Sequence, residues 1–354
     1  MCQKLRYQFK EGYKLNKQAR HITLFMPDLQ NIIQSSNTRK FDNLELMLSR
    51  GIMEDCVDLP YYTQIAEQLG VVIEGDSFPM AAFELYGEAQ SDDKHWVAIA
   101  SPGLLVPNRS HLTMAQADHF NISEEDAKTF CEEMNIHFQE DELRFIFLNP
   151  GRWYCYANKP FTTSIHSPQE IVGQNIITHV PHGEHKMGWQ RLFNEAQMLL
   201  HHSPTNQKRI SEGMPEINHI WFWGGGTLPC GFQSKITNVI SNDKCVKNMA
   251  KLGGVLASPY NEQQLSNIAN LNDSVLMVLT IETLGLSDLT ELDTTLFSSL
   301  IQALNKKQTD ELHVIFEQGK KLVVTRKMLR QFWKRKKGLG HFFPLANDNY
   351  SFQD

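Results

Sequence analysis

Residues 201–229 read HHSPTNQKRISEGMPEINHIWFWGGGTLP, and they hold the most distinctive spacing of rare residue types in the chain. The largely apolar and aromatic stretch at 217–223 predicts a strand that leads directly into the three glycines at 224–226. A glycine-rich loop after a strand can cradle a phosphate. We favour a structural interpretation, in which the aromatic residues lie in a core and the glycines let the chain pass tightly from an inserted domain back into a sheet.

The order of the predicted elements on either side of this stretch indicates an α/β fold. Strands and helices alternate at both ends of the chain, beginning with a buried strand at 21–26. An isolated apolar strand at 274–280 is typical of a parallel sheet. The centre differs, because 143–148 and 152–157 are predicted to pair as a hairpin. We therefore predict an α/β sheet interrupted by an inserted α+β domain.

Helical spacing and capping residues support this division. Ser123 is followed by three acidic residues, which is typical of a helix start. Further helices are predicted at 41–49, 61–69, 189–201, 244–252 and 296–304. The predicted parts are a polar tail at 1–20, a discontinuous core at 21–100 and 220–345, and the inserted domain at 101–219.

Length and composition place the chain among globular proteins. Its 354 residues suit about two domains, and 41% apolar and 21% charged residues are ordinary values. The net charge of −6 gives no overall basic field to attract nucleic acid. No apolar run is long enough to cross a bilayer, and residues 1–17 lack the apolar middle of a signal peptide. We therefore expect a cytoplasmic protein without a membrane span, whose six scattered cysteines are reduced thiols.

The spacing within the quoted stretch resembles that of a known family. The pattern is His202-x-Pro204-x-Asn206-x-x-Arg209-x-x-x-Gly213-x-Pro215-x-Ile217-Asn218-x-x-Trp221-x-Trp223-Gly224-x-Gly226-x-x-Pro229. It resembles the archaeal-type cofactor-independent phosphoglycerate mutases, whose inserted domain ends with a similar order of residues. It is more similar still to the bacterial group called regulatory protein RpfE type, on Asn194-Glu195-x-Gln197-Met198 and the Trp-Phe-Trp-Gly-Gly-Gly run. Weaker similarities extend over residues 21–335.

This resemblance implies an alkaline phosphatase-like sheet sandwiched by helices, together with a particular catalytic centre. Enzymes of that kind hold two divalent metals with aspartates and three histidines, and a serine accepts the phosphoryl group. The metals neutralise the phosphate and activate the serine oxygen. Ser77 is the candidate acceptor here, although its spacing to Gly87 is one residue away from the family pattern.

The metal ligands that the resemblance implies are largely missing. Only His313 and His341 occur after His219, and two histidines cannot fill three places. We therefore expect no metal cofactor. An active metal-dependent, 2,3-bisphosphoglycerate-independent mutase or phosphatase with a rearranged site is the alternative. It would hold Mn or Mg and would need these residues to converge with Ser77: Asp28, Glu282, Glu317 and His313.

Four polar residues are candidates for holding a small anionic ligand, because arginine suits phosphate and carboxylate groups. They are Asn206, Arg209, Asn218 and Arg152. The alternative interpretation is that the first three cap helices and tie loops together, and that Arg152 marks a half-buried strand. His179, His182, His185 and Glu184 form a further cluster, for which a solvated loop is favoured over a metal site.

The basic segment 326–337 (RKMLRQFWKRKK) has seven basic residues among twelve. It could bind an acidic partner, an anionic membrane surface or RNA. We favour a terminal helix that packs its aromatic face on the sheet, and nucleic-acid binding is not expected. Taken together, the sequence favours a degenerate phosphoglycerate mutase-like protein that regulates or interacts, with an unknown protein partner or a small anionic ligand.

Overall fold

The chain folds into two compact units. The first consists of Met1–Leu69, Ser234–Asp243 and Gly254–Asp354, and the second of Gly70–Gln233 and Lys244–Gly253. The predicted insertion at 101–219 is shorter than this second unit, which also takes in the segments on either side of it. The computed structural model describes residues 20–27, 29, 33, 41–74, 77–89, 95–108, 111–115, 121–164, 166–181, 186–230, 232, 234–261, 274–280, 292–316 and 319–343.

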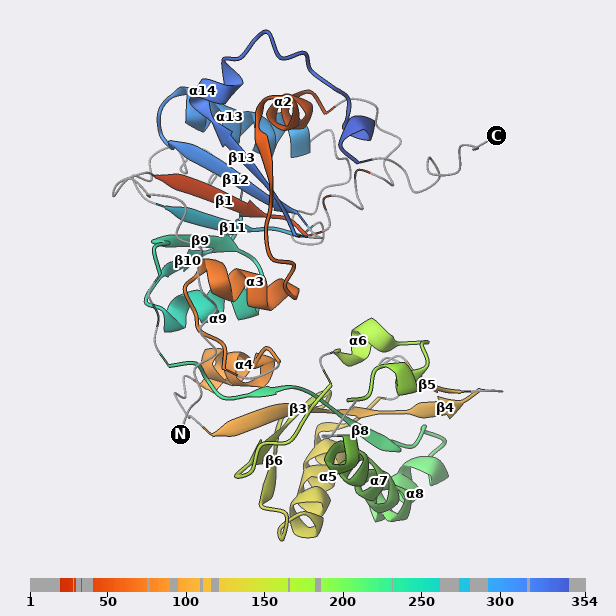
Figure 1. Ribbon diagram of the computed structural model, residues 1–354. Helices are drawn as coiled ribbons and strands as arrows, with labels where there is room; N and C mark the ends of the chain where they lie inside the picture. The colour runs from red at the N-terminus through yellow and green to blue at the C-terminus, as the bar shows by residue number, and fades with distance from the viewer. Residues whose placement is uncertain are drawn as a thin grey trace, which may run out of the picture. The chain divides into compact units, whose positions relative to one another are not determined.

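The first unit is built on a seven-stranded mixed sheet, in the order β10-β9-β11-β1-β12-β13-β2 (Figure 1). The five strands from β10 to β12 run parallel, and β13 pairs antiparallel with both β12 and β2, so β13 alone runs in the opposite direction in this sheet. The strands are β1 (His21–Phe25), β2 (Ile52–Asp55), β9 (Asn238–Ser241), β10 (Leu256–Ser258), β11 (Val275–Val278), β12 (Glu311–Phe316) and β13 (Lys320–Thr325). The strands predicted at 21–26 and 274–280 are confirmed, whereas β2, β9 and β10 were not predicted, because the short segments IMED, NVIS and LAS mix apolar and polar residues.

Helices flank both faces of this sheet. On one face, α2 (Asp42–Arg50) and α13 (Ser298–Asn305) pack into the main apolar core of the unit. A π-helical turn, η4 (Asp293–Phe297), precedes α13, and its Asp293 carboxylate caps α2 by accepting from the backbone N–H groups of Asn43 and Leu44. On the other face lies α3 (Tyr61–Gln68), where Tyr61 packs 5.4 Å from the ring of Phe25.

The second unit contains a four-stranded antiparallel sheet in the order β6-β7-β3-β8. These strands are β3 (Trp96–Gly103), β6 (Leu143–Asn149), β7 (Arg152–Ala157) and β8 (His219–Gly226). The predicted hairpin is thus confirmed as β6 and β7. A separate pair joins β4 (Leu105–Pro107) to β5 (Leu112–Met114). The molecule is therefore mixed α/β with an additional α+β unit, as predicted.

Two groups of helices cover this second sheet. On one face, α5 (Glu124–His137) and α7 (Lys186–His202) form an apolar core with side chains of β3, β6, β7 and β8. The predicted cap is confirmed, because Ser123 Oγ accepts from the backbone N–H of Asp126 at 3.0 Å. On the other face, α4 (Met80–Ala89) packs on β3 and β8 and is itself covered by α9 (Lys244–Leu252). The remaining helices of the unit are α6 (Pro168–Ile171), η2 (Ile176–Thr178) and α8 (Pro204–Ser211).

The basic segment forms much less helix than predicted. Only Arg326–Leu329 is helical, as α14, and a short 3-10 turn, η5 (Leu339–His341), follows later. Phe332 and Trp333 are 80% and 68% exposed, so the prediction that they pack on the sheet is wrong. Among the described residues, no helix combines the length and the hydropathy that crossing a bilayer requires.

Candidate functional site

A charged cluster lies on the α4 face of the four-stranded sheet. Arg152 and Tyr154 are two residues apart in β7, so their side chains project from the same face. Arg152 Nη1 donates to both carboxylate oxygens of Glu84 on α4, at 2.6 and 2.5 Å. Tyr154 Oη donates to Glu84 Oε2 at 2.9 Å. One acidic, one basic and one phenolic side chain therefore form a single hydrogen-bonded group.

Trp223 of β8 forms the wall of this cluster. In the sheet register, Tyr154 and Trp223 both lie opposite Ile99 of β3, which puts them on the same face. The Trp223 indole Nε1 donates to Ser101 Oγ at 2.9 Å, which fixes the plane of the ring. The guanidinium carbon of Arg152 lies 5.9 Å from the ring centre, within the range of a cation–π contact.

Burial and charge set the protonation of the cluster. Burial alone would lower the pKa of Arg152, but the Glu84 carboxylate outweighs it and raises that pKa above its ordinary value. Burial and, after it, the charge of Glu84 raise the pKa of Tyr154. The guanidinium therefore stays charged and the phenol stays a donor. Arg152 Nε and Nη2 donate to no described residue, and the side chain is 31% exposed, so this edge can take the oxygens of an anion.

Glu84 was not predicted as a site residue. It lies in α4, 68 residues from Arg152 along the chain. No local spacing links two residues so far apart, since their contact depends on how α4 packs on the sheet. The basic and aromatic pattern of β7 was the only available signal, and it pointed to Arg152 alone.

Ser77 lies three residues before α4, and its Oγ donates to the backbone carbonyl of Gly225 at 3.1 Å. Gly225 is two residues beyond Trp223 in β8, so Ser77 and Arg152 contact neighbouring positions of the same strand. The residues directly before it, Gly75 and Asp76, lie outside the described part of the chain.

The three glycines at 224–226 belong to β8 itself and do not form a passage between domains as predicted. Protein atoms fill the space beside each of them. A Cβ added to Gly224 would lie 2.8 Å from Cβ of Met80, and one added to Gly226 would lie 2.5 Å from Cβ of Pro79. At Gly225 the nearest atom would be Cζ2 of Trp96, at 2.5 Å. The glycines therefore allow the start of α4 to approach the strand closely, and no phosphate cradle is left open there.

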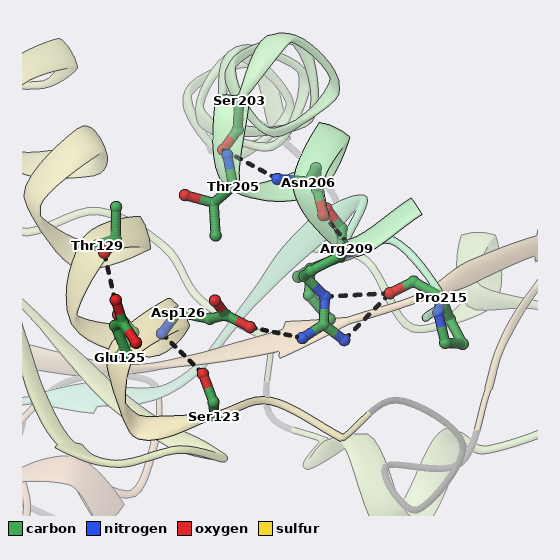
Figure 2. Close-up of polar contacts among 10 residues, drawn as sticks. Ser123, Glu125, Asp126, Thr129, Ser203, Thr205, Asn206, Arg209 and Pro215 are labelled. Carbon is green, nitrogen blue, oxygen red and sulfur yellow. Dashed lines mark hydrogen bonds and ion pairs between the residues drawn. The ribbon is translucent and has the colours of Figure 1, made fainter. Parts of the chain in front are cut away.

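Asn206 and Arg209 of α8 are fully enclosed and take internal partners (Figure 2). Asn206 Nδ2 donates to the carbonyls of Leu200 and Ile217, both at 2.7 Å, and its Oδ1 accepts from the Ile217 N–H at 2.9 Å. Arg209 Nη1 lies 3.0 Å from Asp126 Oδ2, and its Nε and Nη2 donate to the Pro215 carbonyl. These contacts give the two residues the structural role that was the alternative to ligand binding.

A surface depression of about 390 Å³ lies beside this ion pair. Asp126 and Lys208 are among its lining residues, whereas Arg209 is not. The guanidinium of Arg209 is therefore not exposed to the space of the depression.

Asn218 is the residue directly before β8, and its side chain joins this point of the chain to strand β4. Its Oδ1 accepts from the Leu105 N–H at 2.7 Å, and its Nδ2 donates to the Leu105 carbonyl at 3.0 Å. The side chain thus imitates one step of a β-ladder. Of the four predicted ligand residues, Arg152 alone has a donor edge that no described residue occupies, so the structure does not gather the four into one site.

His313 lies in the first half of β12, level with Thr23 in the register. It is three residues before the strand ends, which at about 3.3 Å per residue is roughly 10 Å from the carboxyl end. Its ring stacks on His21 with ring centres 5.7 Å apart, and Nε2 lies 3.2 Å from Glu311 Oε2. His313 is therefore placed with the amino ends of the parallel strands, because His21 and Glu311 begin β1 and β12.

The three acidic candidates, Asp28, Glu282 and Glu317, lie outside the described residues. In sequence they follow β1, β11 and β12, which are parallel neighbours in the sheet. His182, Glu184 and His185 also lie outside, while His179 packs edge-on against His166 with ring centres 4.8 Å apart. Within the described residues, no three His, Cys, Asp or Glu side chains are grouped to hold a metal.

Comparisons with known proteins relate parts of the chain to one group of enzymes. A segment of 129 residues is 30% identical to a probable 2,3-bisphosphoglycerate-independent phosphoglycerate mutase of Geobacter sulfurreducens, covering 35% of this chain and 32% of that protein. A segment of 114 residues is 30% identical to the corresponding mutase of Methanosarcina barkeri, covering 31% and 28%. This chain is similar to cofactor-independent phosphoglycerate mutases.

The matched segments span about a third of the length of these mutases. The solved cofactor-independent phosphoglycerate mutase of Thermoplasma acidophilum aligns over 86% of this chain and 89% of its own, with 14% identity and a TM-score of 0.45. No family model matches the chain. The mutase resemblance of residues 201–229 points to the same enzymes as these sequence relatives do.

Proposed function

We propose that this phosphoglycerate mutase-like protein acts by binding, as a regulatory or interaction protein of the RpfE type, and does not transfer phosphoryl groups. The observation that carries the proposal is the shortage and position of its histidines. Only His313 and His341 follow His219 in the sequence. His313 is directed to the amino end of the sheet by His21 and Glu311.

The topology of the sheet gives this observation its weight. In parallel α/β sheets, ligands bind at the carboxyl ends of the strands. Asp28, Glu282 and Glu317 follow three such ends in sequence, so the carboxylates have the right topological order for a metal site. The imidazole of His313 does not lie at a carboxyl end, because this residue is roughly 10 Å before the end of β12. A dinuclear centre that depends on three imidazoles would therefore lack them, and we expect no bound Mn or Mg.

Arg152 is the residue that we propose for recognition of a small anion. Its guanidinium is held in one orientation by Glu84 and Trp223, which leaves two donor nitrogens on one edge. A planar edge of this kind matches a phosphate or carboxylate group. A protein partner that presents an acidic side chain would meet the same chemistry.

Metal content and turnover test the proposal directly. The purified protein is analysed for metals and assayed for conversion of 3-phosphoglycerate to 2-phosphoglycerate with added manganese. We expect no stoichiometric metal and no turnover. Metal-dependent turnover that is abolished by Ser77→Ala, and retained by the control Ser211→Ala on α8, would establish the active-enzyme alternative in its place.

Anion binding is tested by calorimetric titration with 3-phosphoglycerate and with inorganic phosphate. Arg152→Lys keeps the charge but removes the planar fork, so we expect at least tenfold weaker binding. The control is Arg191→Lys, because Arg191 is an exposed arginine of α7 that pairs with Asp141 and Glu195. Equal affinities of wild type and Arg152→Lys would show that Arg152 does not bind the anion. The expected lack of a dinuclear metal site, which rests on the histidines, would be unaffected.

A further inference from the structure

The chain beyond α14 presents two aromatic side chains to solvent. After Leu329, the backbone makes a tight turn in which the Phe332 N–H bonds to the Arg330 carbonyl at 2.8 Å and the Lys334 N–H to the Gln331 carbonyl at 3.0 Å. This turn ends the helix and directs the next two side chains outward. Phe332 is 80% exposed and Trp333 is 68% exposed, whereas Leu329 is buried.

These two rings are unusual for this protein. Among the described residues, no other phenylalanine or tryptophan is among the exposed large apolar side chains. The two rings touch each other edge to face, with centres 5.3 Å apart and planes at 80°. Adjacent exposed aromatics on one turn form a compact apolar tip, and such a tip marks a site of contact with something outside the chain.

The segment that carries the tip is fastened to α2. Lys336 bonds to Asp42 and lies 3.1 Å from Glu45, and these acidic partners raise its pKa. The Lys337 N–H donates to Ser49 Oγ at 2.9 Å. Arg50 returns a hydrogen bond to the Leu329 carbonyl. The tip is therefore held on both sides by the same helix, and the coil that follows α14 is drawn in blue in Figure 1.

Cationic side chains surround the tip. Arg330, Lys334, Arg335 and Lys337 are exposed, and none of them forms an ion pair with a described carboxylate. Lys336 is different, because its charge is used to fasten the segment. Four cationic side chains without a described carboxylate partner thus lie within four residues of two solvent-facing aromatic rings.

We propose that residues 330–337 form an interfacial anchor that binds anionic lipid bilayers, with Phe332 and Trp333 inserted at the headgroup level. Aromatic rings favour that depth, and lysine and arginine side chains contact the lipid phosphates and carboxylates. A bilayer surface needs no complementary cavity, which suits a convex tip. Bases that stack in succession need parallel platforms, whereas these rings stand at 80° to each other, so single-stranded nucleic acid is disfavoured.

The net charge of the whole chain restricts attraction to an anionic surface to this basic segment. The net charge is −6, so an anionic surface repels most of the protein and attracts this segment. Binding should therefore occur in one orientation, should need anionic lipid and should weaken as salt is raised.

The test uses the full chain and vesicles of phosphatidylcholine with or without phosphatidylserine. We expect co-sedimentation only with the phosphatidylserine vesicles, lost at high salt, together with a blue shift of tryptophan emission and its quenching by brominated lipid. The double variant Phe332→Ala/Trp333→Ala should lose the emission changes and at least tenfold in binding. Lys334→Gln/Arg335→Gln should lose the dependence on phosphatidylserine. Ile136→Ala is the matched control, because Ile136 is 78% exposed on α5.

Two outcomes would overturn this proposal. One is failure of the wild-type protein to bind phosphatidylserine vesicles at low salt. The other is unchanged binding by the Phe332→Ala/Trp333→Ala variant, whose folding is checked by circular dichroism. Binding of a labelled single-stranded RNA or an acidic peptide, without vesicle binding, would assign the tip to that ligand and exclude the lipid surface.

Discussion

The guanidinium of Arg209 lies 3.0 Å from the carboxylate of Asp126, with side chains that are only 1% and 9% exposed. This pair joins α8 to α5 (Figure 2). The arginine also donates to the Pro215 carbonyl six residues further on, so it fixes the chain after α8 as well as the contact with α5, which is 83 residues away in sequence. The motif at 201–229 is therefore partly a folding motif, and its stability consequences can be measured.

Replacement of Arg209 by alanine should destabilise the second unit. The substitution leaves the Asp126 carboxylate buried without its partner, and breaking such a pair costs about 3–5 kcal/mol. Urea unfolding followed by fluorescence measures the change. The control is Arg191→Ala, an exposed pair on α7 for which we expect a loss of about 1 kcal/mol or less. Equal losses for the two variants would contradict this prediction.

Asn206→Asp tests the second buried residue of the motif with almost no change in shape. The wild-type amide donates to two carbonyl oxygens, and a carboxylate would place negative charge against both. We expect a loss of stability of about 1–3 kcal/mol or more, because charged groups are costly to leave unsatisfied. Asn158→Asp, at an exposed position, is the control and should unfold at nearly the wild-type urea concentration.

The glycines of β8 should not tolerate a methyl group. Alanine at Gly225 would bring Cβ to 2.5 Å from the Trp96 ring, so the ring or the strand must move. Overpacking of this kind costs about 1–3 kcal/mol. Gly151→Ala is the comparison, because no atom lies within 4 Å of a Cβ at that position. In thermal unfolding, the melting temperature of Gly225→Ala should be clearly lower than that of Gly151→Ala. A Gly225→Ala protein as stable as wild type would show that the contact with Trp96 is not tight.

His219 should make the protein less stable in mild acid. The ring is fully buried against Gly103, both ring nitrogens lack a hydrogen-bond partner among the described residues, and burial lowers its pKa from 6.5 to about 4. The unfolded chain therefore binds a proton below pH 6.5 that the folded chain refuses. Above pH 6.5, His219 does not reduce the free energy of unfolding. As the pH drops from 6.5 to 4, uptake of this proton by the unfolded chain lowers the free energy of unfolding by about 3 kcal/mol.

His219→Phe provides the test of this pH dependence. The variant should flatten the fall in unfolding free energy between pH 6.5 and 4 relative to wild type. His201→Gln, at an exposed position on α7, should leave the profile unchanged. If both variants follow the wild-type curve, another group controls acid stability.

Sequence reasoning located most of the elements because their signals are local. An apolar run such as VLMV at 275–278 is typical of a buried strand, and Ser123 with three following acids marks a helix start. It also identified the mutase resemblance, because the spacing at 201–229 is written in consecutive residues. The shortage of histidines after His219 likewise needs no structure.

What the residues do was decided by tertiary contacts. Arg152 and Arg209 look alike as candidates for binding an anion. Asp126 and Pro215 take the donors of Arg209, whereas Glu84 and Trp223 hold Arg152 with one edge that no described residue occupies. Phe332 and Trp333 look like core residues in sequence, yet the helix that would bury them ends at Leu329. The physical reason is the same in each case: secondary structure follows from neighbours in the chain, whereas burial and pairing depend on side chains that are distant in sequence and meet only in the folded protein.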